Sequence, residues 1–417
     1  MSVEITVPLL LLMVWGAVVF YFRHQLAALW REPVLVAPVL IVESDDWGPG
    51  PRSHALALSA ICERLAAYRD QSERPAVMTI GAVLACPDTA ALRVGEGSYK
   101  RKMLLDPAFG AMRAALANGC QRGVLALQLH GLEHLWPSAF MHALRTDADV
   151  QQWVENGDGV VTETLPPALQ SRWVDGSELP SVPLPEDEVA EAAAAEVSAF
   201  EACFGFRPAV VVPPTFVWTA AVERAWASQG LRTLVTPGRR YTCRDATGLP
   251  AGVDRSLRNA EAADAPGMLC LVRDIYFEPS LGHTPAQALR RIVEHARLGR
   301  PALIETHRFN FTDDGQSCDQ SIDALDKLFA ATQARLPDVR FVSSEALGDF
   351  IRAGNPDWVC RPRIARLHFW IRRLGCISRL RKVAWATGLA LPAALFYVWS
   401  KPAAQAALQT SRTGETS

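Results

Sequence analysis

Two adjacent carboxylates, Asp45 and Asp46, follow directly on Glu43 and Ser44 at the end of the apolar run 39–42. A short apolar run rich in β-branched residues indicates a buried strand, and the carboxyl ends of such strands are where α/β folds place ligands and catalytic groups. Adjacent carboxylates point in different directions, so one can bind a metal while the other accepts a proton. Aspartate is also common in turns and at helix N-caps, so the pair alone does not establish a site.

Histidines end two further apolar runs. His130 follows the run 124–129, with His134 four residues later, and His307 closes the segment that begins with the run 302–304. Two histidines four residues apart share one face if the strand turns straight into a helix. This spacing is a weak signal by itself, but two imidazoles and a carboxylate are the ligands that a borderline divalent ion prefers. We therefore expect a mononuclear metal site with hydrolytic chemistry.

The composition is that of a folded protein with a large core. A chain of 417 residues, 49% of them apolar, can form one large α/β barrel domain or two ordinary domains. The formal net charge of −2 gives no general reason to expect nucleic-acid binding. The nine cysteines are scattered and form no CxxC pair, which argues against a thiolate zinc site and favours a reducing compartment.

Both ends of the chain carry apolar segments that predict membrane helices. Residues 5–22 and 383–400 are each 18 residues long and uncharged, enough to span a bilayer with slight tilt. The first lacks the features of a cleaved signal peptide, so residues 1–32 are expected to be a retained anchor, with a buried core helix as the alternative. The second contains Pro392, and a flexible tail is expected at 401–417.

Basic residues next to these segments predict their orientation. Eight arginines and lysines and no acidic residue lie at 361–382. The positive-inside rule then places the protein in the inner (cytoplasmic) membrane, with its central domain in the cytoplasm. Apolar residues of the same stretch share a helical face, so 356–382 is expected to form a basic amphipathic helix on the anionic membrane surface. The alternative is an ordinary helix that packs on the domain.

The central region 33–355 alternates short apolar runs with amphipathic stretches. The eight strand-like runs are 39–42, 76–80, 124–129, 209–212, 233–235, 269–272, 302–304 and 339–342, and the clearest helical stretches are 186–204, 220–229, 285–298 and 320–334. This repetition predicts a parallel sheet, either barrel or doubly wound. Chemically competent residues at the carboxyl ends of strands favour the (β/α) barrel. The polar, proline-rich segment 145–185 is expected to be an insertion near the mouth of the site.

Three motifs in chain order resemble those of the NodB-homology polysaccharide deacetylases, a carbohydrate esterase family 4-like superfamily. They are Glu-Ser-Asp-Asp-Trp-Gly at 43–48, His-Gly-Leu-Glu-His at 130–134 and His-Arg-Phe-Asn-Phe at 307–311. The resemblance covers about residues 35–352 and is strongest to a little-characterised branch. It implies a distorted seven-stranded NodB-type barrel and removal of an N-acyl group, most simply N-acetyl, from an amino sugar.

The resemblance also implies a role for each motif residue. The ligands of Zn²⁺ or another divalent ion would be Asp46, His130 and His134. Asp45 would be the general base that activates water, and His307 the general acid that protonates the departing amine. Asp274, which follows the apolar run 269–272, would orient His307.

The chain departs from the superfamily at the third motif. Arg-Pro-Pro-Tyr-Gly becomes Val-Pro-Pro-Thr-Phe at 212–216, so the arginine that positions the base is missing. We expect its charge and hydrogen bonds to come from Arg239, Arg240 and Tyr241. Trp47 is expected either to stack on a sugar or to lie in the core, and Arg308 either to contact substrate or to bond within its loop. Glu133 and Glu305 are expected to orient the histidines.

Two classes of function remain open. The first is a membrane-anchored hydrolase that acts on an N-acylated amino-sugar glycan, polymeric or lipid-linked, with another amide or a formyl group as a variant. The second is a catalytically impaired glycan-binding or scaffold component of surface polysaccharide biosynthesis, which loss of the third-motif arginine favours. The complete set of motif acids and histidines favours catalysis.

Overall fold

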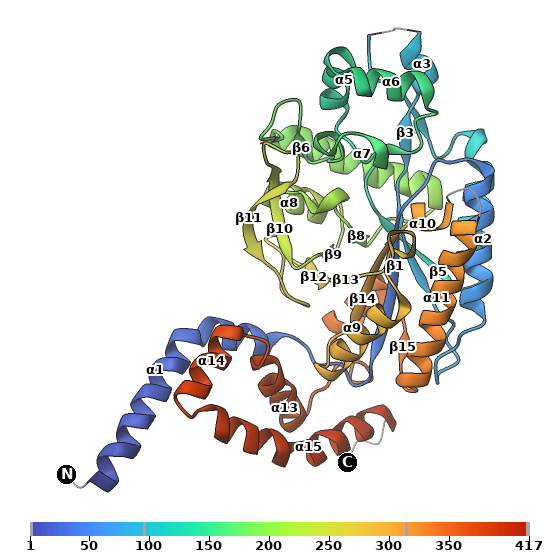
Figure 1. Ribbon diagram of the computed structural model, residues 1–417. Coiled ribbons are helices and arrows are strands. Elements are labelled where there is room, and N and C mark those ends of the chain that lie inside the picture. The colour runs from blue at the N-terminus through green and yellow to red at the C-terminus, as the bar shows by residue number, and fades with distance from the viewer. Residues whose placement is uncertain (1–2, 95–96, 313–315, 414–417) are drawn as a thin grey trace. The chain divides into compact units, whose positions relative to one another are not determined.

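The computed structural model describes residues 3–94, 97–312 and 316–413 (Figure 1). It divides into two compact units. The larger unit consists of Leu40–Ile292 and Ala302–Gly348, and the smaller of Met1–Val39, Val293–Pro301 and Asp349–Ser417. The motifs predicted to bind metal therefore belong to the larger unit and the predicted membrane segments to the smaller one.

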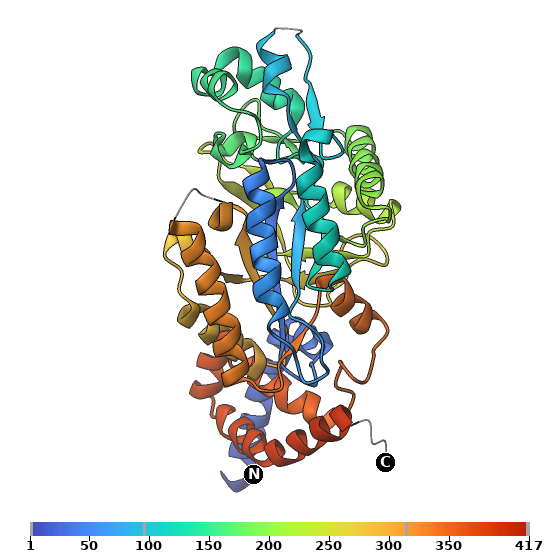
Figure 2. The same cartoon turned by 90° about the vertical axis from the view of Figure 1, so that its right-hand side faces the viewer.

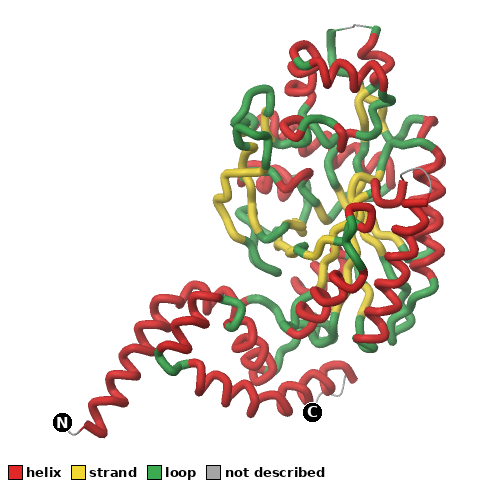
Figure 3. The backbone as a smooth tube through the Cα atoms, in the orientation of Figure 1, coloured by secondary structure: helices red, strands yellow, loops and turns green. Residues whose placement is uncertain are grey.

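A nine-stranded sheet forms the centre of the larger unit, with helices outside it (Figure 3). The strand order is β12-β9-β8-β5-β2-β1-β14-β13, with β15 beside β1. All neighbours along the main path are parallel. The strands are β1 (Val39–Trp47), β2 (Met78–Ala82), β5 (Leu125–Leu129), β8 (Val210–Val211), β9 (Thr233–Thr236), β12 (Leu269–Val272), β13 (Ile275–Tyr276), β14 (Ala302–His307) and β15 (Arg340–Phe341). Each of the eight predicted runs overlaps one of them, and β13 is additional.

The sheet curls into a barrel-like shape. Strands β12 and β13 stand at opposite ends of the strand order, yet only Arg273 and Asp274 separate them in the chain. Consecutive Cα atoms are about 3.8 Å apart, so this link holds the two edges within about 11 Å of each other. The fold is thus an α/β barrel-like one, as predicted in its coarse form. Its seam, where the edges share no backbone pairing, lies at Arg273.

Amphipathic helices cover the sheet. Helices α2, α4 and α11 lie side by side along one flank (Figure 2). Leu58, Ile61 and Leu65 of α2 join the core that contains Ile80 and Leu127 of the sheet. The covering helices are α2 (Arg52–Ala66), α4 (Gly110–Gln121), α7 (Glu186–Phe204), α8 (Ala220–Ser228), α9 (Pro285–Arg297) and α11 (Gln316–Arg335), so all four predicted helical stretches are present.

Shorter elements lie between the strands. The predicted insertion 145–185 contains α6 (Ala148–Asn156) and the pair β6 (Val174–Asp175) and β7 (Val182–Pro183). Two more antiparallel pairs are β3 (Ala85–Pro87) with β4 (Arg101–Met103) and β10 (Arg239–Arg244) with β11 (Pro250–Ser256). The remaining short helices are α3 (Thr89–Arg93), α5 (Pro137–Thr146), α10 (Phe309–Thr312) and α12 (Ser344–Arg352).

The smaller unit is helical and differs in part from the sequence prediction. Helix α1 (Val3–Arg31) includes Leu9–Arg31, the one helix of the described chain that alone meets the length and hydropathy of a membrane span. The predicted second span is not one helix, because α14 (Ser378–Ala386) and α15 (Ala390–Thr413) meet at 108°. Gly388 lies in this bend with φ of 73°, a conformation that costs glycine little. Hydropathy does not reveal such a bend.

The regions flanking that segment also differ from the prediction. The basic stretch 356–382 holds α13 (Arg363–Leu374) and the start of α14, separated by a break, rather than one helix. Residues 401–413, predicted as a flexible tail, continue α15, and 414–417 lie outside the described residues. Arg373 is buried, and its guanidinium donates to the carbonyls of Glu32, Pro33, Leu298 and Gly299. It therefore holds this unit together instead of facing a membrane.

Candidate metal and catalytic site

The three predicted metal ligands meet in the larger unit. Asp46 Oδ1 lies 3.3 Å from His130 Nε2 and 3.4 Å from His134 Nε2. The possible ligand atoms of the three residues all lie within 4.8 Å of one another, and all three side chains are buried. The carboxyl ends of β1 and β5 thus form a cluster of one carboxylate and two imidazoles.

A local irregularity lets both aspartates face the same pocket. Successive residues of a regular strand point to opposite faces of the sheet. The register of β1 against β2 shifts between Ser44 and Trp47, and Asp46 has φ of 69°. A non-glycine residue in this left-handed region is strained by about 1–3 kcal/mol. This left-handed backbone conformation directs the Asp46 side chain so that its carboxylate and that of Asp45 line one cavity.

An irregular turn, not the helix considered from the spacing, brings the two histidines together. Strand β5 ends at Leu129 and α5 begins only at Pro137, and Gly131 in the turn between them has φ of 100°. The Nδ1 atom of His130 lies 2.9 Å from the carbonyl oxygen of Val212. Since a carbonyl can only accept, Nδ1 carries the proton, and Nε2 has a lone pair free to bind a metal ion.

This cluster fits a divalent ion by its donor set and by an oxygen without a hydrogen-bond partner. Asp46 Oδ1 is buried and receives no hydrogen bond from the residues that the structure describes, as expected of an atom that binds a metal. Burial alone would raise the pKa of Asp46, but His134 and His130 hold it well below its ordinary value. Burial lowers the pKa of His134 to about 4, whereas burial of His130 is outweighed by the charges of Asp45 and Asp46, which raise its pKa. Carboxylate and neutral imidazole are the forms that ligate metals.

Asp45 is held by an arginine that the sequence analysis did not select. Its Oδ2 accepts a hydrogen bond of 2.6 Å from Arg273, whose guanidinium also lies 2.9 Å from Glu43 and 3.3 Å from Glu305. Arg273 is only 1% exposed. Burial would raise the pKa of Asp45, but the charges of Arg273 and His130 lower it below its ordinary value. The carboxylate therefore stays ionised and can accept a proton.

Arg273 makes the contact with the candidate base that we expected from Arg239, Arg240 and Tyr241. The three predicted substitutes, Arg239, Arg240 and Tyr241, lie on β10, and none lines the pocket that contains Asp45. Arg240 instead pairs with Glu223, Asp254 and Asp264 at 3.0, 2.7 and 2.7 Å. Arg273 follows directly on the apolar run 269–272, so its position at a strand end was the available signal.

His307 is oriented by Glu278, where the resemblance implied Asp274. Its Nδ1 lies 2.7 Å from Glu278 Oε1, whereas Asp274 lies 3.1 Å from Arg291. Asn310 donates to the second oxygen of Glu278 and so fixes this carboxylate. Burial opposes the charge on His307, but the hydrogen bond to Glu278 and the charge of Asp46 raise its pKa to about 10. The imidazole is thus protonated at neutral pH, as a general acid must be.

The predicted ligands, base and acid line one pocket of about 200 Å³. The insertion 145–185 contributes Glu163 and Gln170 to its wall, and the segment that replaces the third motif contributes Pro213, Thr215 and Phe216. The sequence analysis placed both segments near the site but assigned no role to these individual residues. A cavity of this size is smaller than the roughly 300–1,000 Å³ of sites for whole drug-sized ligands, so it accommodates a reacting group rather than a long glycan.

Trp47 and Arg308 are buried and do not line the pocket. Trp47 is fully buried in the core, and its Nε1 donates to Ser44 Oγ over 2.8 Å, so the core alternative applies and no sugar can stack on it. Arg308 is also buried, and it donates to the carbonyls of Pro49 and Val160 and to Glu163. Arg308 therefore connects the insertion to the loop after β1.

Glu133 and Glu305 also differ from the expected orienting role. Glu133 pairs with Arg172 at 2.8 Å and with Arg101 at 2.7 Å. Glu305 pairs with Arg273 and lies 3.8 Å from His307 Nε2. Glu133 therefore pairs with two arginines that do not line the pocket, and Glu305 pairs with Arg273 and adds negative charge beside the acid.

Comparison with known proteins gives a likeness of fold. No family model and no curated protein matches the sequence. A family 4 carbohydrate esterase from Streptomyces lividans matches at a TM-score of 0.35 and 12% identity, over 75% of this chain and 95% of that one. The peptidoglycan deacetylase PdaC from Bacillus subtilis matches at 0.34 and 12%, over 78% and 94%.

The likeness also extends beyond deacetylases. A 4-alpha-glucanotransferase from Thermococcus litoralis matches at a TM-score of 0.39 and 9% identity, over 74% of this chain and 40% of that one. The solved structures similar to this chain thus include polysaccharide deacetylases of carbohydrate esterase family 4, the superfamily that its motifs resemble.

Proposed function

We propose that this protein is a membrane-anchored, metal-dependent hydrolase that removes an N-acyl group, most simply N-acetyl, from an amino sugar of a polysaccharide or lipid-linked glycan. The observation that carries the proposal is the arrangement around one pocket. The carboxylate-imidazole cluster, the Asp45–Arg273 pair and the His307–Glu278 pair all contribute to its wall. These are the parts that amide hydrolysis requires.

The residues divide the chemistry between them. A zinc or similar divalent ion held by Asp46, His130 and His134 would polarise the amide carbonyl and acidify water. Asp45, kept ionised by Arg273, takes the proton of the attacking water. His307, kept protonated by Glu278, gives a proton to the departing amine nitrogen. Arg273 therefore supplies the function whose apparent loss favoured a non-catalytic scaffold.

The size of the pocket and the apolar helix of the smaller unit favour a small acyl group on a membrane-bound glycan as the substrate. A space of about 200 Å³ lined by the metal-ligand candidates, Asp45 and His307 suits a small acyl group presented by a larger molecule that stays outside. Leu9–Arg31 would anchor the chain in a membrane. The eight arginines and lysines at 361–382, with no acidic residue among them, favour the inner membrane with the catalytic unit in the cytoplasm, where a lipid-linked glycan would be the available substrate.

The test compares metal content and activity in full-length protein purified in neutral detergent. Wild type should carry about one divalent ion and release acetate from acetylated amino-sugar oligomers. His130→Ala and Asp46→Ala should lose both, because each removes one of three ligands. His142→Ala is the matched control, since His142 lies on α5 and does not line the pocket, and it should keep both.

Two results would contradict the proposal in different ways. If wild type binds no divalent ion, even on titration, the hydrolase is wrong and the glycan-binding scaffold becomes the better account. If the ion binds and acetate is not released, but formate or another acid is, the metal hydrolase stands and the acyl group changes.

A further inference from the structure

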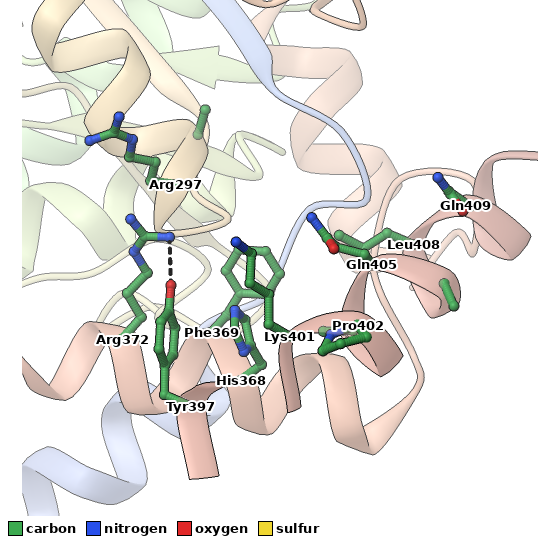
Figure 4. Close-up of a pocket in the computed structure, with 13 residues that line it drawn as sticks. Arg297, His368, Phe369, Arg372, Tyr397, Lys401, Pro402, Gln405, Leu408 and Gln409 are labelled. Carbon is green, nitrogen blue, oxygen red and sulfur yellow. Dashed lines mark hydrogen bonds between the residues drawn. The ribbon is translucent and has the colours of Figure 1, made fainter. Parts of the chain in front are cut away.

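The smaller unit contains a basic pocket that the proposed hydrolase does not use. It has a volume of about 580 Å³ and lies between α13, α15 and the end of α9. Figure 4 shows its side chains, among them Arg297, Arg372, Lys401 and His368. None of its 13 lining residues is acidic.

The positive charge in this pocket is not neutralised within the unit. In the described chain Arg297 and Lys401 have no acidic partner, and Arg372 donates only to the hydroxyl of Tyr397, over 3.1 Å. The Tyr397 hydroxyl accepts from Arg372, so its own proton is available to another acceptor. Burial and then the charge of Arg372 lower the pKa of His368. The pocket thus offers several donors and net positive charge, which a phosphate group matches.

An apolar groove of about 470 Å³ begins one helical turn away on the same helix. Pro392 and Ala393 of α15 line the groove, and Tyr397 lines the basic pocket. Val18 and Leu26 of α1 and Trp370 of α13 form other parts of the groove wall. Its surface is almost wholly apolar, unlike that of the basic pocket. A ligand that fills both cavities must combine an anionic group with a hydrocarbon chain.

The outer face of α15 points to the source of this ligand. Four of its large apolar side chains are between 64% and 69% exposed, namely Leu391, Leu395, Val398 and Trp399. Their spacing of four, three and one residues places them on one face of the helix. A helix with an exposed apolar face beside a basic cluster is typical of the lipid interface.

We infer that the smaller unit binds an anionic membrane lipid, with its phosphate in the basic pocket and an acyl chain in the apolar groove. Arg372, Lys401 and the Tyr397 hydroxyl contact the phosphate. Pro392 and Ala393 contact the chain. The inference does not rest on the proposed hydrolase activity, because no residue of the metal cluster lines either cavity.

The experiment uses full-length protein in neutral detergent micelles titrated with phosphatidylglycerol, and native mass spectrometry counts the bound lipid. The double variant R372Q/K401Q should bind phosphatidylglycerol about tenfold more weakly or worse, because two charge-assisted hydrogen bonds are lost. The control R363Q/R379Q removes the same charge from exposed arginines of α13 and α14 that line neither cavity. It should bind as wild type does.

Further arms separate the lipid from its parts. Phosphatidylcholine should bind at least about tenfold more weakly than phosphatidylglycerol, because it carries no net charge. The variant A393W fills the groove, so it should weaken binding of phosphatidylglycerol while leaving binding of inorganic phosphate unaffected. An equal loss of phosphatidylglycerol binding in R372Q/K401Q and R363Q/R379Q would show that the basic pocket is not the phosphate site. If inorganic phosphate competes for the site as strongly as the lipid does, the apolar groove does not bind the acyl chain.

Discussion

Two arginines of the larger unit are each surrounded by three carboxylates, yet they serve different ends. Arg273 pairs with Glu43, Asp45 and Glu305, whose side chains are 0%, 1% and 6% exposed. Arg240 pairs with Glu223, which is buried, and with Asp254 and Asp264, which are 44% and 38% exposed. One cluster is closed to water and the other is half hydrated.

The difference teaches that surroundings, and not residue type, decide which arginine acts in the site. Asp254 and Asp264 can be solvated without Arg240, and the buried Glu223 also accepts hydrogen bonds from Trp218 Nε1 and the backbone N–H of Asp264. The carboxylates around Arg273 cannot be solvated in this way, and one of them is the proposed base. Exposed ion pairs contribute about 0–1 kcal/mol, whereas breaking a buried pair costs about 3–5 kcal/mol because a charge is left uncompensated.

The largest effect is therefore expected for Arg273. Arg273→Gln should lower the free energy of unfolding by about 3–5 kcal/mol and reduce kcat by about 10²–10³-fold, as for loss of a fixed charge in an active site. Arg240→Gln should cost about 1–2 kcal/mol and leave kcat unchanged. Thermal unfolding and acetate release measure both.

Arg273→Lys tests the role of Arg273 in catalysis if Arg273→Gln does not fold. A lysine restores the charge and most of the stability, but it cannot make the forked contacts to Glu43 and Asp45, so kcat should stay low. Loss of activity in Arg240→Gln with metal still bound would break the comparison.

The same contrast applies to the acid, where Glu278 is buried beside His307 and Asp274 is not. The protonated imidazole is lost as pH rises through its pKa of about 10. Glu278→Gln keeps an acceptor but removes the negative charge that stabilises the imidazolium, so this pKa falls and the alkaline limb of the kcat profile moves to lower pH. His307→Ala should reduce kcat by about 10²–10⁴-fold. Asp274→Asn is the control, and movement of the limb in that variant would restore Asp274 as the orienting residue.

A smaller effect is expected from crowding Asp45 without changing any charge. A Cβ atom on Gly81 would lie 2.3 Å from Asp45 Oδ1, so Gly81→Ala must displace the carboxylate. We expect kcat to fall by about 10–100-fold, with metal content unchanged because Asp46 is not touched. Gly110→Ala is the matched control, since its nearest neighbour would be 3.9 Å away. Equal kcat values in the two variants would argue against Asp45 as the base.

The smallest effect on catalysis is expected for Trp47. Trp47→Phe loses the bond to Ser44 and some buried area, which should cost about 1–3 kcal/mol of unfolding free energy, while KM stays constant. Thermal unfolding and KM for an acetylated oligomer test this. A raised KM at unchanged stability would return Trp47 to the sugar-binding role.

Sequence reasoning found the ligands and the strands because their signals are local. Asp46, His130 and His307 each follow an apolar run, and parallel strands bring such positions to one edge whatever the details of the packing. The spacing of His130 and His134 indicated that they act together as ligands. It did not indicate the backbone conformation, because a turn around Gly131 brings the two side chains together as well as a helix would.

What the sequence by itself determined is the α/β barrel-like class and the candidate metal ligands with their candidate base and acid. Only the tertiary structure decided which residues support them. Arg273 reaches Asp45 from 228 residues away across the seam of the barrel, and Glu278 reaches His307 from 29 residues away. Such pairs depend on how the strands curl and on which charges are closed to water. No pattern within one segment carries that information.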